Sequence, residues 1–323
     1  MTFTKTVALP VTPDEAFALV TQPERLRRWK TVTAQIELRV GGEFRYSVTP
    51  GHHAGGTVRE IEPGKRVVIG WGWEDDDSLP YDASTVTITI EPAEGGSTVT
   101  LSHEGLNAEQ ELGHAEGWNH FLGRLERLAT TGDAGPDEWS WAPENLDPII
   151  AAEAGLAVLQ PILRNLKDSD RTLPTPCEEF TVHDLAVHLM DSITSLGAMV
   201  GVQVLPPEQG SLEDKVSTMA AQALEVWRTF DLSGKVVDRD LPASFAVNIF
   251  AIEFLLHAWD FAQATGQEVH VSDEVVDYVA SLAAEVIPVA RRSGAFADEL
   301  APSSDASPLE RLVAFSGRPT QAA

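Results

Sequence analysis

The pattern of apolar positions divides the chain into two halves with different periods. In the first half, short runs of β-branched and aromatic residues are bounded by Gly, Pro and acidic turn residues, as antiparallel strands are. In the second half, apolar residues recur every three to four positions over long stretches, which predicts helices. The predicted strands cover residues 42–48, 66–73, 84–92 and 97–105.

Two helices frame these strands. Residues 12–29 offer Thr12 as a cap and Pro13 at the first helical position, and an apolar repeat follows. Residues 113–129 carry a second apolar repeat at helical spacing: Trp118, Phe121, Leu122, Leu125 and Leu128. The first half is therefore predicted to be an α+β domain, in which an antiparallel curved sheet wraps a long C-terminal helix.

The stretch between the halves loses periodicity and collects Gly, Pro, Asp and Glu, which is typical of a linker. We place the first domain at residues 1–130, the linker at 131–146 and the second domain at 147–323. The second domain is predicted to be all-α. Its helices cover residues 149–166, 182–200, 212–230, 245–266 and 273–292, with short joints suited to a bundle. The tail from Ser293, with a short amphipathic segment at 308–315, is expected to drape over that bundle.

Composition excludes several classes of partner. The 323 residues include 49 acidic and 23 basic ones, and the net charge of −26 repels a phosphate backbone. We therefore expect neither nucleic acid nor an anionic membrane as a partner. The N-terminus lacks a signal-peptide pattern, and the chain lacks an uninterrupted apolar run of about 18 residues, so the expectation is a cytoplasmic protein.

The single cysteine, Cys177, cannot form an internal disulfide or a multi-cysteine metal site. Any metal must be held by His and carboxylates. Because Cys177 lies in a Pro-rich turn before a helix, a structural role is favoured over that of a nucleophile.

The apolar segment 245–266 nevertheless carries a polar stripe. Glu253, His257 and Asp260 are four and three residues apart, so they share one face of a helix. Each buried ionisable group reduces the stability of the fold by on the order of several kcal/mol unless it is paired or binds a metal. Something must therefore compensate them.

A second stripe places Asp184, His188 and Asp191 at the same spacing, on a helix that Thr181 and Asp184 begin with a capping box. Facing stripes on two helices can assemble a metal site inside a bundle.

We predict a divalent ion held by His188, Glu253 and His257, with zinc as the first choice and iron as the second. One coordination position would stay open, as in catalytic zinc sites. The spacing alone also fits a hydrogen-bonded pair of Glu253 and His257, with Asp260 facing solvent.

The segments "LPTPCEEFTVHDLAVHLM" and "EFLLHAWDFAQATG" together resemble the metal-binding domain of mycothiol-dependent maleylpyruvate isomerases. That domain is a branch of the DinB-like four-helix bundles of actinobacteria. The resemblance covers about residues 147–292 and implies zinc on His188, Glu253 and His257. We assign supporting positions around the ligands to Asp260 and Asp191, either of which would close the site if it acted as a fourth ligand.

This resemblance also implies thiol chemistry. The open position would bind mycothiol or another low-molecular-weight thiol and hold it as a thiolate. The isomerases carry a C-terminal domain that contributes to the reaction, whereas this sequence has an unrelated N-terminal domain, so maleylpyruvate isomerisation itself is not expected.

The segments "TQPERLRRWKT", "VGGEFRYSV", "GTVREIEPGKRVVIGWGW", "STVTITIEPAEGGSTVTLSHEGL" and "EGWNHFLGRLERL" are similar in order and spacing to the SRPBCC superfamily. They look most like its branch related to the activator of the heat-shock chaperone ATPase. This resemblance implies a helix-grip fold with a START-like cavity for a small hydrophobic molecule. The candidate lining residues are Trp29, Phe44, Trp71, Trp73, Trp118 and Phe121, although large aromatic residues also commonly form the core.

Other histidines of the first half show no ligand spacing. His52 and His53 are expected in a turn, and His103, His114 and His120 are scattered.

The sequence thus predicts a zinc-dependent, thiol-cofactor transferase or isomerase that acts on a small apolar electrophile, with the SRPBCC cavity as its ligand pocket. Metal-assisted hydrolysis is a variant of this hypothesis. The alternative is a non-catalytic ligand-binding or stress-response protein with a structural metal or none. A homodimer is compatible with the sequence, and no catalytic or cofactor-binding side chain is assigned.

Overall fold

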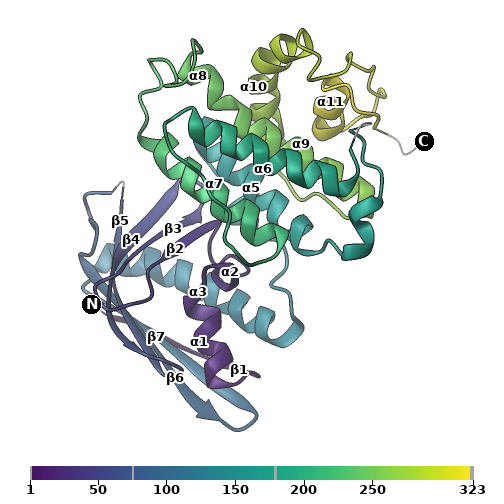
Figure 1. Cartoon of the computed structure of the whole chain (residues 1–323). Coiled ribbons are helices and arrows are strands. Elements are labelled where there is room, and N and C mark those ends of the chain that lie inside the picture. The colour runs from purple at the N-terminus through teal and green to yellow at the C-terminus, as the bar shows by residue number, and fades with distance from the viewer. Residues whose placement is uncertain (1, 75, 178–179, 321–323) are drawn as a thin grey trace. The chain divides into compact units, whose positions relative to one another are not determined.

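The computed structural model describes residues 2–74, 76–177 and 180–320 and divides into two compact units, residues 1–136 and 137–323 (Figure 1). The boundary falls inside the predicted linker. That linker is partly structured, because Asp137 caps the short helix α4 (Glu138–Trp141), which packs against α5 (Pro148–Arg164) of the second unit.

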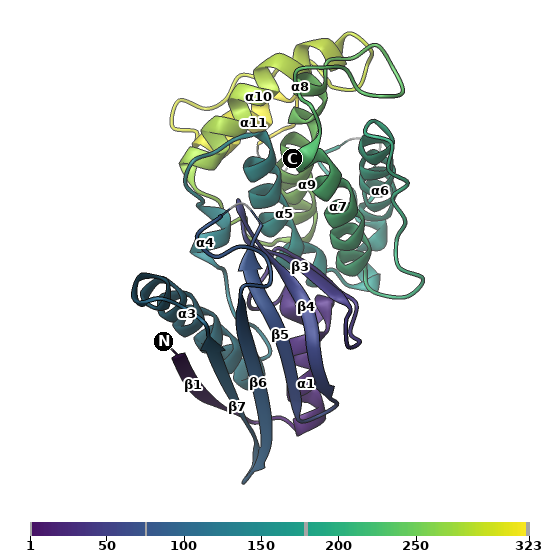
Figure 2. The same ribbon diagram turned by 90° about the vertical axis from the view of Figure 1, so that its left-hand side faces the viewer.

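The described strands of the N-terminal unit form one antiparallel sheet in the order β1-β7-β6-β5-β4-β3-β2 (Figure 2). Their bounds are β1 Thr2–Leu9, β2 Thr33–Ile36, β3 Glu43–Thr49, β4 His52–Glu62, β5 Arg66–Trp73, β6 Ser84–Ala93 and β7 Gly96–Glu104. The four predicted strands correspond to β3, β5, β6 and β7. The sheet also contains β1, β2 and β4, which the pattern did not predict.

The long helix α3 (Ala108–Thr131) has a defined start and end. Asn107 and Gln110 form a reciprocal capping box, and Gly132 ends the helix in the left-handed conformation, with φ 84°. The apolar residues predicted for this helix are its buried residues, and they share one core with the sheet. The prediction of a sheet packed on a long C-terminal helix is confirmed for this unit.

The first predicted helix is interrupted. The Thr12 hydroxyl accepts a hydrogen bond from the Glu15 amide and caps α1 (Pro13–Thr21), as predicted. Gln22 then adopts an extended conformation because it precedes Pro23, and a short α2 (Pro23–Leu26) follows.

His52 and His53 were predicted to lie in a turn. They instead form the start of β4. This strand also contains Gly56, which local propensity assigns to a turn. A Cβ at Gly56 would lie 1.9 Å from the Gly70 carbonyl oxygen of β5, so the close approach of the two strands requires glycine there.

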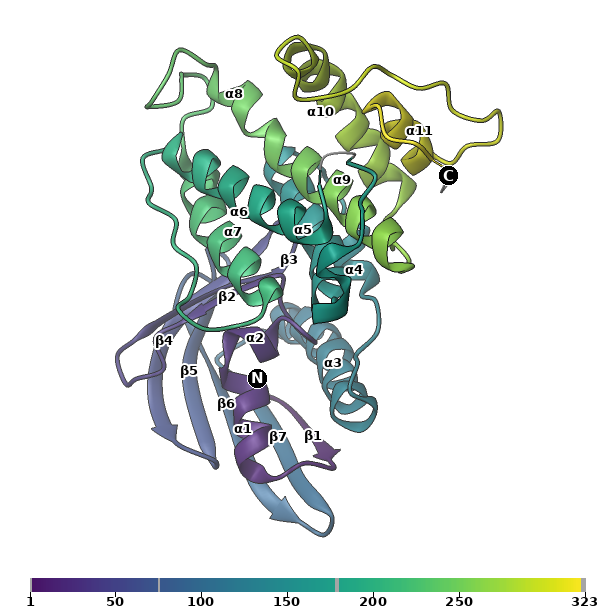
Figure 3. The same ribbon diagram turned by 45° about the vertical axis from the view of Figure 1, so that its right-hand side comes forward.

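The described part of the C-terminal unit is helical, with two isolated β-bridges. Helix α5 packs against α7 and α9, and α6 packs against α7 and α9, which forms a bundle (Figure 3). Helix α10 packs on α9 and α5, and α11 packs on α10, so the tail lies against the bundle. The bounds are α5 Pro148–Arg164, α6 Val182–Ala198, α7 Leu212–Thr229, α8 Ala243–Ala246, α9 Asn248–Thr265, α10 Asp273–Arg291 and α11 Pro308–Phe315, with a 3-10 turn at Asp168–Thr172.

Helix α9 is the central helix of this bundle and is buried on nearly every side. The stretch Ala243–Thr265 is long and apolar enough to cross a membrane by length and composition, which the sequence pattern did not anticipate. However, 83% of its most apolar window is buried inside the protein, as in the core helix of a soluble protein.

Candidate functional site

Two helices of the C-terminal unit bring three ligand-type side chains together. Glu253 and His257 lie one turn apart on α9, and His188 projects from the neighbouring α6. Each offers one ligand atom, and these atoms all lie within 4.8 Å of one another. His257 is buried, whereas the side chain of His188 is 37% exposed, so the cluster is reached from the His188 side.

The spacing of the three atoms fits a metal ion. Glu253 Oε2 lies 3.4 Å from His188 Nε2 and 3.4 Å from His257 Nε2, longer than a good hydrogen bond. This oxygen is buried without a hydrogen-bond partner. Ligands at about 2.0–2.1 Å from zinc, arranged tetrahedrally, lie about 3.3 Å apart. An ion in this position would give this oxygen a closer partner than either imidazole provides.

Asp260 orients His257 from the side away from Glu253. His257 Nδ1 lies 2.9 Å from Asp260 Oδ2, so an N–H on Nδ1 leaves the Nε2 lone pair directed at the cluster. Asp260 is fully buried. This arrangement is the one expected if Asp260 supports a ligand without binding the ion.

Arg318, from the tail after α11, holds Asp260 in turn. Its Nε donates to Asp260 Oδ1 at 2.8 Å and its Nη2 donates to Oδ2 at 2.9 Å. Burial alone would raise the pKa of Asp260, but the charges of Arg318 and His257 outweigh it and hold that pKa below its usual range. Asp260 therefore stays a carboxylate, and His257 stays oriented.

The pKa values of Glu253 and His257 likewise depend on burial and on the neighbouring charges. Burial opposes the charge on Glu253, but the adjacent His257 lowers the pKa of Glu253. Burial likewise opposes the charge on His257, but Glu253 and Asp260 raise the pKa of His257 to about 9. Without an ion, the pair therefore carries opposite charges, and a metal must displace the proton of His257.

Cys177 lies at the edge of this network. Its Sγ accepts a hydrogen bond from Arg318 Nη2 at 3.3 Å. Burial raises the pKa of the Cys177 thiol to about 11, so the thiol stays protonated at neutral pH and is a poor nucleophile.

The supporting position predicted for Asp191 is corrected. Asp191 is exposed, and among the described residues its carboxylate joins no cluster with His188. Asp184 caps α6 through Thr181, as its capping-box pattern predicts.

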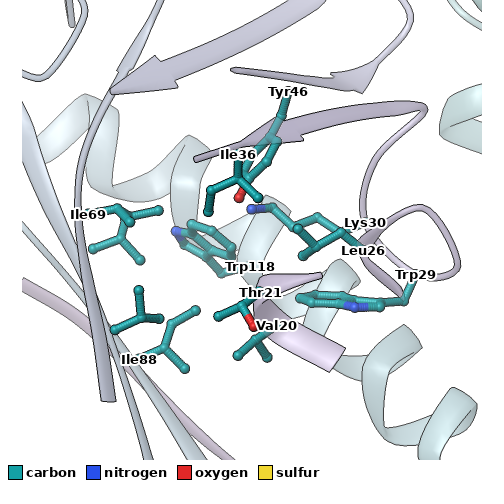
Figure 4. Close-up of a pocket in the computed structure, with 12 residues that line it drawn as sticks. Val20, Thr21, Leu26, Trp29, Lys30, Ile36, Tyr46, Ile69, Ile88 and Trp118 are labelled. Carbon is teal, nitrogen blue, oxygen red and sulfur yellow. The ribbon is translucent and has the colours of Figure 1, made fainter. Parts of the chain in front are cut away.

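The N-terminal unit contains a small apolar cavity between the sheet and the helices (Figure 4). Of the six aromatic residues predicted to line it, only Trp29 and Trp118 do so. Phe44, Trp71 and Phe121 are buried core residues, and Trp73 packs against that core. The cavity measures about 10 Å³, about the space that one water molecule needs.

The cavity also contains polar residues that the sequence did not single out. Its lining includes Thr21, Lys30 and Tyr46 beside apolar side chains. The Thr21 hydroxyl donates to the Phe17 carbonyl at 2.6 Å, so it is already satisfied.

His103 and His114, which are separated in the sequence, lie together in the N-terminal unit with ring centroids 4.7 Å apart. His103 Nδ1 accepts from the Trp118 indole at 3.1 Å, and its Nε2 lies 2.8 Å from Ser84 Oγ. Burial is the main cause that lowers the pKa of His103 to about 3. Because the Ser84 hydroxyl donates to the Trp71 carbonyl at 2.8 Å, His103 and Ser84 are a buried structural pair rather than a nucleophile and its base.

Comparison with known proteins identifies the class of the N-terminal unit as a helix-grip domain of the SRPBCC type. Residues 10–130 match the family described as "Activator of Hsp90 ATPase homolog 1-like protein". The match spans α1 to α3, and with it nearly the whole sheet.

An uncharacterized protein of Mycobacterium tuberculosis strain H37Rv is 29% identical over 179 residues, which cover 54% of this chain and 98% of that protein. A protein of strain CDC 1551 matches to the same extent. An alignment over 54% of the chain exceeds the N-terminal unit, so it includes residues of the helical unit.

Several solved structures resemble part of the chain. Protein MLL2253 from Mesorhizobium loti is 24% identical, covers 40% of this chain and 96% of its own, and has a TM-score of 0.37. The Aha1 dimer from Colwellia psychrerythraea is 17% identical over 41% of this chain and 98% of its own, with a TM-score of 0.37. DynU16, from the dynemicin biosynthetic locus, is 21% identical over 54% of this chain and 61% of its own, with a TM-score of 0.39.

Proposed function

We propose that the helical unit binds zinc through His188, Glu253 and His257 and uses it in a thiol-dependent transfer or isomerisation. Iron is the second choice of metal. The substrate class is a small apolar electrophile, and the cavity of the N-terminal unit is its ligand pocket. The observation that carries the proposal is the buried Glu253 oxygen without a hydrogen-bond partner, 3.4 Å from each of two imidazole nitrogens.

The three side chains suit a reactive site because a position stays free. A structural zinc site is closed by four protein ligands. Asp191 is exposed, and Asp260 is engaged by Arg318 and His257, so neither supplies a fourth ligand. The ligand set is therefore two imidazoles and one carboxylate, which is also the set proposed for a DinB-like bundle of the isomerase type.

Bound zinc would supply Lewis-acid chemistry, which holds the thiol of mycothiol or a similar cofactor as a thiolate at neutral pH. The protein residues keep the site ready for it. Asp260 and Arg318 fix the ring of His257, and Glu253 contributes a negative charge that offsets part of the charge of the ion. Phe180 stacks on His188 with ring centroids 5.2 Å apart, which limits the movement of the one exposed ligand.

Cobalt substitution tests this function. The full chain is loaded with Co²⁺, and a small thiol such as mycothiol is added while near-ultraviolet absorption is recorded. We expect a thiolate-to-cobalt band in the wild type and in the control variant His270→Ala, whose side chain lies in an exposed loop. The band should be absent in His188→Ala. Cobalt that binds without any thiolate band would contradict the thiol chemistry while leaving the metal site intact.

A further inference from the structure

Lys30 lies in the core of the N-terminal unit and not at its surface. It is 6% exposed, and its amine points into the cavity (Figure 4). Nζ lies 4.7 Å from the ring centroids of Tyr46 and Trp71 and 4.8 Å from that of Trp118. These rings attract a cation, but a ring face is a weak substitute for the water that an ammonium group loses on burial.

The described residues place no carboxylate within ion-pair distance of this amine. Burial lowers the pKa of Lys30 to about 7. The indole N–H of Trp71, whose ring centroid lies 4.7 Å from the amine, is buried without an acceptor among the described residues. This core therefore contains an excess of hydrogen-bond donors, and an unpaired buried donor is costly.

The other donors around the cavity are already satisfied. The Trp29 indole donates to the Leu19 carbonyl at 2.9 Å, and the Trp118 indole donates to His103. Within the part of the chain that the structure describes, no ion pair or hydrogen bond engages the amine of Lys30 or the hydroxyl of Tyr46, the other two polar groups of the lining. A ligand that enters here meets an ammonium and a phenol at one end and apolar side chains elsewhere.

We propose that this cavity binds a small apolar carboxylate, whose oxygens accept hydrogen bonds from Lys30 Nζ and Tyr46 Oη. This inference rests on the part of the proposed function that makes the cavity the ligand pocket, and it narrows the apolar electrophile to one that also carries a carboxylate. A charge-assisted hydrogen bond to a carboxylate is about twice as strong as a neutral one, so the acid is preferred over its alcohol or amide.

The apolar body of the acid would lie among Leu26, Ile36 and Ile88. Since the cavity holds about 10 Å³, these side chains must move to admit it. Ile36 is the half-buried member of the lining, whereas the others are buried, so it marks the side of entry.

The test compares hexanoate with 1-hexanol by isothermal titration calorimetry on the full chain at pH 6. We expect hexanoate to bind the wild type roughly tenfold or more tightly than hexanol. Lys30→Met, which keeps the length of the side chain and removes its charge, should lose this preference. Tyr46→Phe should weaken hexanoate binding but keep the preference, because the ammonium remains.

The preference should also depend on pH. Tyr46, whose pKa burial raises, and His103, whose pKa burial lowers to about 3, both stay neutral between pH 6 and pH 9. Lys30 is the group facing the cavity that loses its charge in this range. Hexanoate affinity should therefore fall up to roughly a hundredfold from pH 6 to pH 9, while hexanol affinity stays constant.

Two results would overturn the assignment. They are equal binding of both ligands by the wild type and an unchanged preference in Lys30→Met. The double variant His188→Ala, His257→Ala separates this inference from the metal proposal, because it should bind hexanoate as the wild type does. A wild type that takes up no zinc and still prefers hexanoate would contradict the metal proposal alone.

Discussion

Replacing Lys30 by methionine should stabilise the N-terminal unit, and by an amount that depends on pH. The pKa of Lys30 falls from 10.5 to about 7 in the folded protein. At about 1.4 kcal/mol for each tenfold change in proton affinity, this difference corresponds to about 5 kcal/mol. This difference is the free-energy cost of burying the ammonium group when the chain folds. A methionine fills a similar volume without that cost.

The direction of the pH dependence follows from proton binding. Between pH 7 and pH 10.5, the unfolded chain binds the proton of Lys30 while the folded chain has released it, so wild-type stability rises with pH. Below pH 7 both states bind the proton and the full penalty remains. The gain from Lys30→Met should therefore be about 5 kcal/mol at pH 6, about 2 kcal/mol at pH 9, and nearly absent above pH 10.5.

Amide hydrogen exchange in peptides of β5, β6 and β7, measured across a urea series, gives the stability of this unit within the full chain. Wild type and variant are compared at the same pH, so the intrinsic exchange rate cancels. Lys65→Met is the matched control, because Lys65 is exposed and its loss should change little at any pH. A gain below about 1 kcal/mol at pH 6, or a gain that grows with pH, would refute the reasoning.

Three further predictions concern the helical unit. Arg318→Gln should weaken zinc binding roughly 10- to 100-fold because Asp260 loses its partner, and Arg318→Lys should restore part of the affinity. Competition with a chromophoric chelator measures the zinc affinity of both variants. An unchanged affinity would contradict the positioning role of Arg318. Cys177→Ser should keep both zinc affinity and the thiolate band of the cobalt protein, because the thiol is protonated; loss of the band would make Cys177 a participant. Asp191→Ala should leave zinc affinity within about twofold of the wild-type value, whereas Asp260→Asn should reduce it. The reverse order would support the position beside the ligands that the sequence predicted for Asp191.

The features that the sequence predicted well depend on local spacing. Thr181 and Asp184 lie three residues apart, so their capping box can be read directly and fixes the start of α6. Glu253 and His257 lie one turn apart within an apolar segment, so their shared face is equally visible. The meeting of α9 with His188 follows from bundle packing, which the short joints between the predicted helices and the resemblance to a family both suggested.

The features that sequence reasoning missed depend on contacts between distant segments. Arg318 lies 58 residues from Asp260 and follows an exposed tail, and no local pattern marks it as buried. Lys30 follows two arginines in "RLRRWKT", which reads as a solvated basic run. Only the packing of the helices against the sheet makes it a core residue.

The lining of the cavity was mispredicted for a related reason. An aromatic residue type does not distinguish a side chain that lines a cavity from one that packs in the core. Phe44 and Trp71 are core residues that stack on each other with ring centroids 5.9 Å apart. Strand β4 was missed because Gly55 and Gly56 resemble a turn, although their small size is what allows the neighbouring segments to approach.

The central claim is that His188, Glu253 and His257 hold a metal ion. Elemental analysis of the purified full chain tests it most directly, beside the double variant His188→Ala, His257→Ala and the control His183→Ala, whose side chain is exposed on the same helix. We predict about one zinc per chain in the wild type and in the control, and none in the double variant. A wild type that stays free of metal after incubation with zinc would contradict the account and leave Glu253 and His257 as an internal ion pair.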